Sequence, residues 1–226
     1  MKVHQELRIG PLTSEQETEF ISWIARRLSA GWSRDTGRED ELNREAGLRF
    51  YCFGCNQNAE RAAATLLLVH PARRTTSWLY VSNIIPKDTR ELDYDQYNHI
   101  LCEFHDRFAK PAADSLNVSV ELSAPEQSVE NWLSPESARR LREFSAAANK
   151  STGSSHPMDR ERWCDFLIAM HRANENPSVG LLERWLVEEE KWPQEVAFDL
   201  ISEFEFARDL LSRFNSIVDD RRHLHR

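Results

Sequence analysis

The chain has 226 residues, of which 40% are hydrophobic and 29% charged, with seven glycines, nine prolines and a net charge of −8. A chain of this length and apolar content can bury about 70% of its unfolded surface, which excludes a wholly disordered, collagen-like or low-complexity protein. The negative charge argues against a general nucleic-acid-binding surface, because such surfaces carry Lys and Arg in excess.

The first 123 residues predict a sheet with flanking helices. Thr13 and Ser14 precede Glu17 as in a capping box, so we expect a helix from about residue 14 to residue 30. The charged stretch 31–47 predicts a loop with a short helix near residues 39–44. Short β-compatible runs that end at turn residues predict three strands, at residues 48–53, 62–69 and 77–85, although the middle run is also compatible with the start of a helix.

A second helix and a fourth strand complete this part. Residues 92–109 carry apolar side chains at helical spacing, and Pro111 is expected to end or kink the helix. Residues 117–122 alternate as a strand does. The predicted fold class is therefore α+β, with a small mixed sheet and flanking helices over residues 1–123.

The predicted order of helix, three strands, helix and strand is similar to the core of acyltransferases that use acetyl-CoA. In those enzymes a Gly-rich turn after the fourth strand binds the pyrophosphate through its amides. The corresponding stretch here, 87–94, has no glycine and three acidic residues, which repel a pyrophosphate. The resemblance therefore concerns the order of the elements, and it assigns no family.

The rest of the chain predicts an all-α part. A helix that begins at Ser134-Pro135 runs to about residue 150, and the segment 151–157 (STGSSHP) predicts a linker. This linker either separates two domains or forms a surface loop within one. Three helices follow, and the stripe of the last one predicts that Phe214 is buried. The helices are expected at residues 160–174, 179–190 and 194–214. The predicted segments are an α+β domain at 1–123, a helix and Ser-rich linker at 124–157, and an acidic helical domain at 158–226.

The compartment is predicted from the absence of targeting patterns. The first residues lack the apolar stretch of a secretory signal, and the longest apolar run, 62–69, is too short to cross a bilayer. We therefore expect a cytoplasmic protein without a membrane partner, in which the four cysteines are free thiols.

Acidic residues dominate the C-terminal helices. Between residues 183 and 209, nine acidic residues stand against three basic ones. This pattern is typical either of a solvated outer face or of a surface that docks a basic partner. Trp192, beside Pro193, is expected to be an exposed anchor, because Trp is favoured at interfaces. The predicted partner-binding residues are Glu188, Glu189, Glu190, Trp192, Asp199 and Glu203.

A second candidate site lies at the end of the strand predicted at 77–85. Two polar residues interrupt an apolar run there, just before Pro86. A polar interruption at the end of a sheet is typical either of a ligand contact or of a capped turn. The predicted ligand-binding residues are Ser82, Asn83, Tyr97 and His99.

A third candidate is a metal site. Cys52 and Cys55 form a CxxC pair, and Cys102 and His105 lie on one face of the predicted helix. These are the ligand types of tetrahedral zinc, provided that Gly54 makes a turn, because in a regular strand the two cysteines face opposite sides. The other interpretation is four half-buried side chains, and no cofactor is expected apart from this zinc.

No phosphate-binding glycine loop, nucleophile elbow or HExxH motif occurs in the chain. The sequence therefore favours a non-enzymatic interaction protein, of the antitoxin, immunity-protein or regulatory-subunit kind, that docks a basic partner through its acidic helices. The alternative is an enzyme that performs acyl transfer or metal-assisted hydrolysis near Ser82 and Asn83.

Overall fold

The computed structural model describes residues 1–29, 31–44, 47–71, 76–88 and 91–224, with side chains up to residue 217 except that of Thr76. Residue contacts divide the chain into two compact units, Lys2–Pro125 and Glu126–Arg226, and Met1 belongs to the second unit. Each unit has its own hydrophobic core. None of the helices in the described ranges combines the length and apolar character that a membrane span needs.

The unit Lys2–Pro125 contains an antiparallel sheet. Its described strands are β1 (Leu7–Thr13), β2 (Trp32–Arg34), β3 (Leu48–Cys55), β4 (Ala64–Pro71), β5 (Thr76–Pro86) and β6 (Val120–Leu122). They form one sheet in the order β2-β3-β4-β5-β1-β6, in which all neighbours are antiparallel. The α+β class is thus confirmed, whereas the expected mixed sheet is wrong. Strands β2, β3, β4 and β5 are neighbours in chain order, and β1 lies between β5 and β6.

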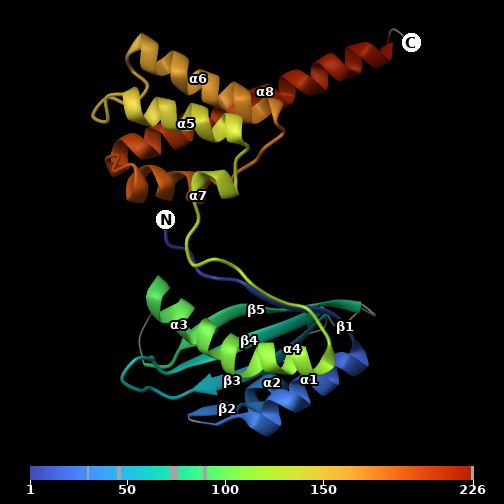
Figure 1. The fold of residues 1–226 in the computed structure, drawn as a ribbon. Helices are drawn as coiled ribbons and strands as arrows, with labels where there is room; N and C mark the ends of the chain where they lie inside the picture. Colours follow the sequence, from blue (N-terminus) through green and yellow to red (C-terminus); the bar gives the residue numbers. More distant parts are fainter. Residues whose placement is uncertain (30, 45–46, 72–75, 89–90, 225–226) are drawn as a thin grey trace. The chain divides into compact units, whose positions relative to one another are not determined.

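Helices cover one face of this sheet (Figure 1). The helices of the unit are α1 (Ser14–Arg27), α2 (Thr36–Leu42), α3 (Tyr94–Phe104), the π-helical turn η1 (His105–Ala109) and α4 (Lys110–Leu116). Alternate strand residues, such as Ile9, Phe53, Leu66 and Leu79, are fully buried in one core with α1, α3 and α4. Because side chains alternate along a strand, the remaining strand residues lie on the opposite face.

Strand β1 was not expected from the sequence. Gly10 and Pro11 interrupt its apolar pattern, and β1 accommodates them as an irregularity between Ile9 and Leu12. Gly10 has a φ of 123°, and a Cβ there would lie 2.8 Å from the backbone N of Leu12. The position therefore requires glycine. The residues on either side of the irregularity still reach the core, since Ile9 and Leu12 are fully buried.

The stretch predicted as a loop at 31–47 contains more structure than expected. It holds the three-residue strand β2, which pairs with β3, and the helix α2. Helix α2 begins earlier than predicted, because the Asp35 side chain accepts a hydrogen bond from the N–H of Arg38 and caps the first turn. Residues 45–46 lie outside the described residues.

The helix predicted over 92–109 does not end at Pro111. It passes through η1 into α4 and stops at Asn117, which adopts the left-handed conformation with a φ of 52°. Proline cannot donate the backbone hydrogen bond that a regular helix requires. The wide π-helical turn before Pro111, in which the Lys110 N–H donates to the His105 carbonyl, lets the helix continue without that bond. The last strand is consequently shorter than the predicted 117–122.

The unit Glu126–Arg226 is helical in its described residues. Its helices are η2 (Val129–Asn131), α5 (Pro135–Ala147), α6 (Pro157–Arg172), α7 (Val179–Arg184), the π-helical turn η3 (Trp185–Glu189) and α8 (Gln194–Leu224). Large aromatic side chains fill its core, among them Phe144, Trp163, Trp185 and Phe204. The helices predicted in this region are all present.

The segment 151–157 lies between α5 and α6. Ser154 in this segment is 5% exposed, and its hydroxyl donates a hydrogen bond to the Glu203 carboxylate. One sequence expectation needs correction in this unit. Phe214 is 61% exposed rather than buried, because α8 continues beyond the core, whose last buried α8 residue is Phe204. The division of the chain into independently folding domains stays a prediction.

Candidate functional site

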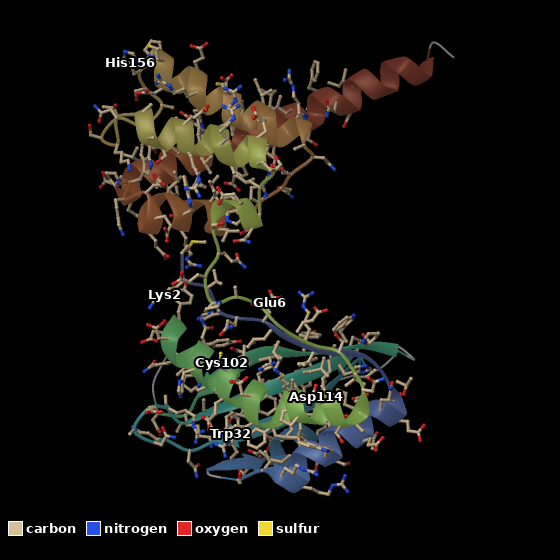
Figure 2. All side chains as sticks on the ribbon, viewed as in Figure 1. Lys2, Glu6, Trp32, Cys102, Asp114 and His156 are labelled. Atoms are coloured by element: carbon tan, nitrogen blue, oxygen red, sulfur yellow. The ribbon has the colours of Figure 1, made fainter. Side chains whose placement is uncertain are left out.

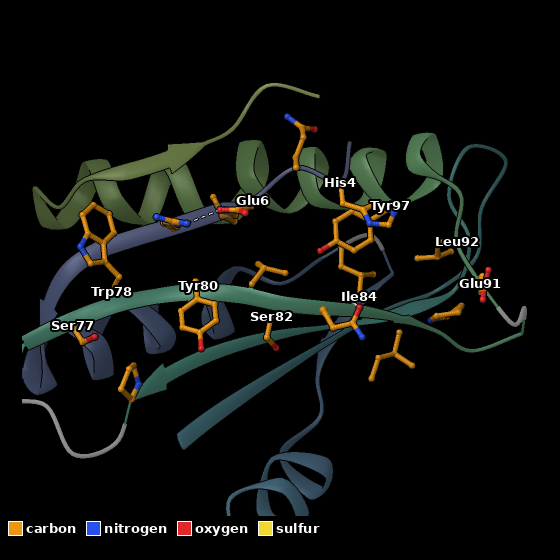
Figure 3. Close-up of a pocket in the computed structure, with 18 residues that line it drawn as sticks. His4, Glu6, Ser77, Trp78, Tyr80, Ser82, Ile84, Glu91, Leu92 and Tyr97 are labelled. Carbon is orange, nitrogen blue, oxygen red and sulfur yellow. Dashed lines mark hydrogen bonds and ion pairs between the residues drawn. The ribbon is translucent and has the colours of Figure 1, made fainter. Parts of the chain in front are cut away.

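A groove of about 1080 Å³ lies along β1 and β5 in the unit Lys2–Pro125. Figure 3 shows that β5, the start of β1 and the beginning of α3 contribute its walls. Four ring side chains line it, namely His4, Trp78, Tyr80 and Tyr97. Its charged lining residues are Glu6, Arg8 and Glu91.

The groove arises where β1 and β5 separate. The two strands pair at Ile9–Leu79 and Arg8–Tyr80. The next pair in this register would be Leu7–Val81, and it is not formed. Strand β1 continues along β6, where Leu7 pairs with Leu122, while β5 continues along β4 as far as Pro86. The two strands therefore enclose a gap that widens from Tyr80 onward.

A β-bulge in β5 lies at this gap. Leu67 of β4 pairs with Asn83 and Leu68 pairs with Val81, so Ser82 has no residue opposite it. Bulges increase the local twist of a strand and are common beside binding sites. The Ser82 hydroxyl donates to the Leu67 carbonyl at 3.4 Å, and no other hydrogen bond of this hydroxyl occurs among the described residues. Among the described residues, this hydroxyl therefore has no hydrogen bond to a base of the kind that activates a serine nucleophile.

Two asparagine side chains bind backbone groups on the two sides of the gap. On β5, the Asn83 Oδ1 accepts a hydrogen bond from the N–H of Ile84 at 2.8 Å. On the other side, Asn98 of α3 accepts from the N–H of Gln5 and donates to the carbonyl of Val3, both at 2.8 Å. Asn98 is 8% exposed, whereas Asn83 is exposed. The Asn83 side chain, which caps the backbone N–H on β5, is therefore open to solvent. The Asn98 side chain, which caps the backbone of the N-terminal segment, is shielded from it.

The charged residues of the groove lining are two acids and one base. Arg8 and Glu6 form an exposed ion pair at 2.7 Å (Figure 3). The His4 ring lies 4.4 Å from the Tyr97 ring. Burial, and to a smaller extent the Glu6 carboxylate, raises the pKa of Tyr97. The Tyr97 hydroxyl consequently keeps its proton at neutral pH, and the groove offers neutral aromatic surface beside a self-compensated charge pair.

The structure brings together three of the four residues predicted at the end of the sheet. Ser82, Asn83 and Tyr97 line the groove, whereas His99 lies outside its lining and is exposed on α3. Residues two apart on a helix point in nearly opposite directions, which separates His99 from Tyr97. Trp78 and the residues before β1 were missed. Without β1, nothing in the sequence indicated that the N-terminal segment reaches this strand.

The acidic residues predicted to bind a partner lie in the helical unit, and several of them already have partners there. Glu188 pairs with Arg184 at 3.0 Å. The N-terminal amine of Met1 binds Glu189 at 2.6 Å and lowers the pKa of that carboxyl. Glu190 accepts a hydrogen bond from the Ser145 hydroxyl at 2.7 Å. Of the remaining two acids, Asp199 is exposed and Glu203 binds Ser154.

Trp192, expected to be exposed, is 2% exposed. Its indole N–H donates to the Ser145 hydroxyl at 2.8 Å, and its ring stacks on Phe144 with an interplanar angle of 11°. Lys191, in the left-handed region with a φ of 60°, turns the chain so that Trp192 points into the core. The expectation failed because the adjacent Pro193 indicates a turn but not the direction of the preceding side chain.

The residues predicted as zinc ligands are not gathered into one site. Gly54 makes no turn, since β3 pairs regularly from Leu48 to Cys55, and Cys52 therefore does not face the same side as Cys55. Cys102 lies on α3 (Figure 2), and its thiol contacts the Gln5 Oε1 at 3.1 Å. His105 contacts Asp106. Within the described ranges, no group of three or more His, Cys, Asp or Glu side chains is placed to hold a metal ion.

A buried polar cluster beneath α1 was also missed by the sequence analysis. Glu17 is fully buried and accepts a hydrogen bond from the Tyr51 hydroxyl at 2.6 Å. His70 and Arg49 lie 3.4 and 3.5 Å from the same carboxylate. These contacts join α1 to β3 and β4, so the cluster fixes the position of the helix on the sheet.

Comparison with protein-family models, curated proteins and solved structures found no match to this chain. The function is therefore inferred from the residues themselves. Among the described residues, the groove between β1 and β5 is the place where aromatic rings, polar groups and the end of a strand pairing come together.

Proposed function

We propose that this chain is a non-enzymatic interaction protein that binds a partner polypeptide in the groove between β1 and β5. The observation that carries the proposal is the separation of the two strands after Tyr80, which leaves a groove lined by Trp, Tyr and His rings. Such a protein is of the antitoxin, immunity-protein or regulatory-subunit kind, and we place it in the cytoplasm.

The shape of the groove favours a polypeptide. Its volume of about 1080 Å³ lies slightly above the range of about 300–1,000 Å³ that small-molecule pockets occupy. Trp78 and Tyr80 are half-buried, so part of each residue is accessible to a partner. Rings of this kind are the commonest anchors of protein interfaces.

The acidic helices support the interaction less directly. Glu188, Glu189 and Glu190 are engaged in bonds within their own unit, and Trp192 belongs to its core. The net charge of −8 nevertheless favours a basic partner, because long-range attraction accelerates the encounter of oppositely charged proteins.

Native mass spectrometry of the protein purified from the cells that make it tests this proposal. We expect a stoichiometric polypeptide bound to the wild-type chain, and its loss from Trp78→Ala. Phe206→Ala is the matched control, because Phe206 is an equally large aromatic residue, 70% exposed, in the other unit. A partner that Trp78→Ala retains, or a bound small molecule in place of a polypeptide, would contradict the proposal.

A further inference from the structure

We propose that the partner binds as an added β-strand, whose backbone pairs with the free edge of β5 between Val81 and Pro86. This inference rests on the proposed function and specifies the form of the partner, namely an extended segment of polypeptide chain. Strand addition uses main-chain hydrogen bonds for affinity and the alternating side chains for specificity.

The first argument is the free edge itself. Among the described residues, β5 pairs with β4 alone beyond Tyr80. In an antiparallel pair, every second residue directs its N–H and C=O away from the neighbouring strand. Ile84 belongs to that set, because its N–H donates to the Asn83 side chain rather than to β4. Ile84 thus presents a donor and an acceptor toward the gap.

Pro86 supports the same assignment. It lies two residues after Ile84 and opposite Ala64, so its backbone nitrogen faces the same side of β5. Proline has no N–H, and it is tolerated in a sheet where that N–H would point away from the neighbouring strand. The sequence of β5 is therefore consistent with an edge from Ile84 onward, and Pro86 limits the length over which a new strand can pair.

Asn83 acts as a removable cap on this edge. An unpaired strand edge attracts other chains, and proteins commonly protect such edges. Asn83 is exposed, and its oxygen satisfies the Ile84 N–H without any other residue moving into the gap. A change of side-chain rotamer releases the N–H, which can then bind a carbonyl of an incoming strand. Asn83 therefore competes with the partner.

The opposite side of the gap is closed to such pairing. Asn98 holds both Val3 and Gln5 through bonds of 2.8 Å, and it is 8% exposed. Its release would leave buried polar groups unpaired, which is costly. The added strand consequently pairs with β5 and not with the N-terminal segment.

The walls of the groove indicate the pattern of the partner sequence. Figure 3 shows Leu92 and Tyr97 on the α3 side of the groove and Tyr80 on β5. Successive side chains of an added strand point to opposite faces, so alternate residues meet the Leu92 and Tyr97 side. We therefore expect apolar residues at every second position of the bound segment and polar ones between them.

A phage-displayed library of random linear dodecapeptides, selected on the full chain, supplies the probe. The peptide that binds most tightly is then synthesised with a single N-methyl group at each position in turn. Strand addition predicts an alternating result: about a tenfold loss of affinity at every second position, where the amide faces β5, and little change between them. An N-methyl scan without this alternation overturns strand addition.

Variants of the protein separate the mode of binding from the site. Asn83→Ala should bind the peptide severalfold more tightly, because the cap no longer competes, whereas Asn83→Asp retains the acceptor and should show no gain. Trp78→Ala should weaken binding in either mode. A peptide whose binding is weakened by Trp78→Ala but whose N-methyl scan shows no alternation would support the proposed function and contradict strand addition. A library that yields no Trp78-dependent peptide overturns both.

Discussion

The Asn83 Oδ1 lies 2.8 Å from the backbone N–H of Ile84, its immediate neighbour on β5. This bond takes the place of one that a neighbouring strand would make. It occurs just beyond the point where β1 leaves β5 and beside the bulge at Ser82. The separation of the strands, the bulge and the side-chain cap together define an edge that is stable alone and able to pair.

Asn98 should be far more important for stability than Asn83. Asn98→Ala removes the partners of two backbone groups, those of Val3 and Gln5, in a site where Asn98 is 8% exposed. We expect a loss of about 3 kcal/mol in the free energy of unfolding, measured by urea denaturation. Asn83→Ala, at an exposed position, is the matched control and should change it little. Equal losses of unfolding free energy in the two variants would contradict the claim that Asn98 stabilises the fold and Asn83 does not.

Trp192 should behave as a core residue and not as a binding residue. Trp192→Ala removes a ring that is 2% exposed and stacked on Phe144, and it leaves the Ser145 hydroxyl without its indole donor. We expect a loss of about 3–5 kcal/mol in unfolding free energy. Phe206→Ala, which removes an exposed ring from the same unit, should have almost no effect. A stable Trp192→Ala variant would restore Trp192 as an interface candidate.

The cysteines should differ sharply in reactivity. Burial, with the nearby Glu39 charge, raises the pKa of Cys52 to about 11, and burial also raises the pKa of Cys55. Cys164 is exposed. Because the thiolate is the reactive form, Ellman's reagent at pH 8 should label Cys164 fast and Cys52 and Cys55 slowly in the folded protein. All four should react in denaturant, and rapid labelling of Cys52 in the native state would refute this burial.

Glu103 should make the unit Lys2–Pro125 sensitive to acid. It accepts hydrogen bonds from Arg61, Arg107 and the Trp32 indole. Burial acts to raise the pKa of Glu103, but the three donors outweigh it and hold the pKa below its usual value. A lowered carboxyl pKa stabilises the fold above the unfolded pKa of about 4.3, and this stability disappears as the pH falls through the folded pKa.

Glu103→Gln should therefore lower the unfolding free energy at pH 7 and flatten its fall below about pH 4. We expect about 3 kcal/mol at pH 7, because the Arg61 side chain, 1% exposed, loses its counter-charge. Glu136→Gln, which removes an exposed acid that also has a lowered pKa, is the control and should change stability little. Identical acid profiles for wild type and Glu103→Gln would contradict the argument.

The sequence predicted the long elements better than the site. Helices with caps and apolar stripes, such as those beginning near Ser14 and Pro135, were located from local signals. Strand β1 was hidden, because Gly10 and Pro11 resemble a break and become a strand only when β5 pairs with them. The groove depends on that strand. Ser82 and Asn83 could be selected from the sequence because they interrupt an apolar run. His4 and Arg8 could not, because they reach the groove only through the pairing of β1 with β5, which is distant in sequence.

The exchange of backbone amide hydrogens at Ile84 and Ile85, followed by NMR with and without the selected peptide, tests the central claim most directly. Ile85 alternates with Ile84 and directs its N–H toward β4. We predict that Ile84 exchanges much faster than Ile85 in the free protein and slows at least tenfold when the peptide binds, while Ile85 stays slow in both states. An Ile84 amide whose exchange the bound peptide leaves unchanged would show that no strand is added to β5.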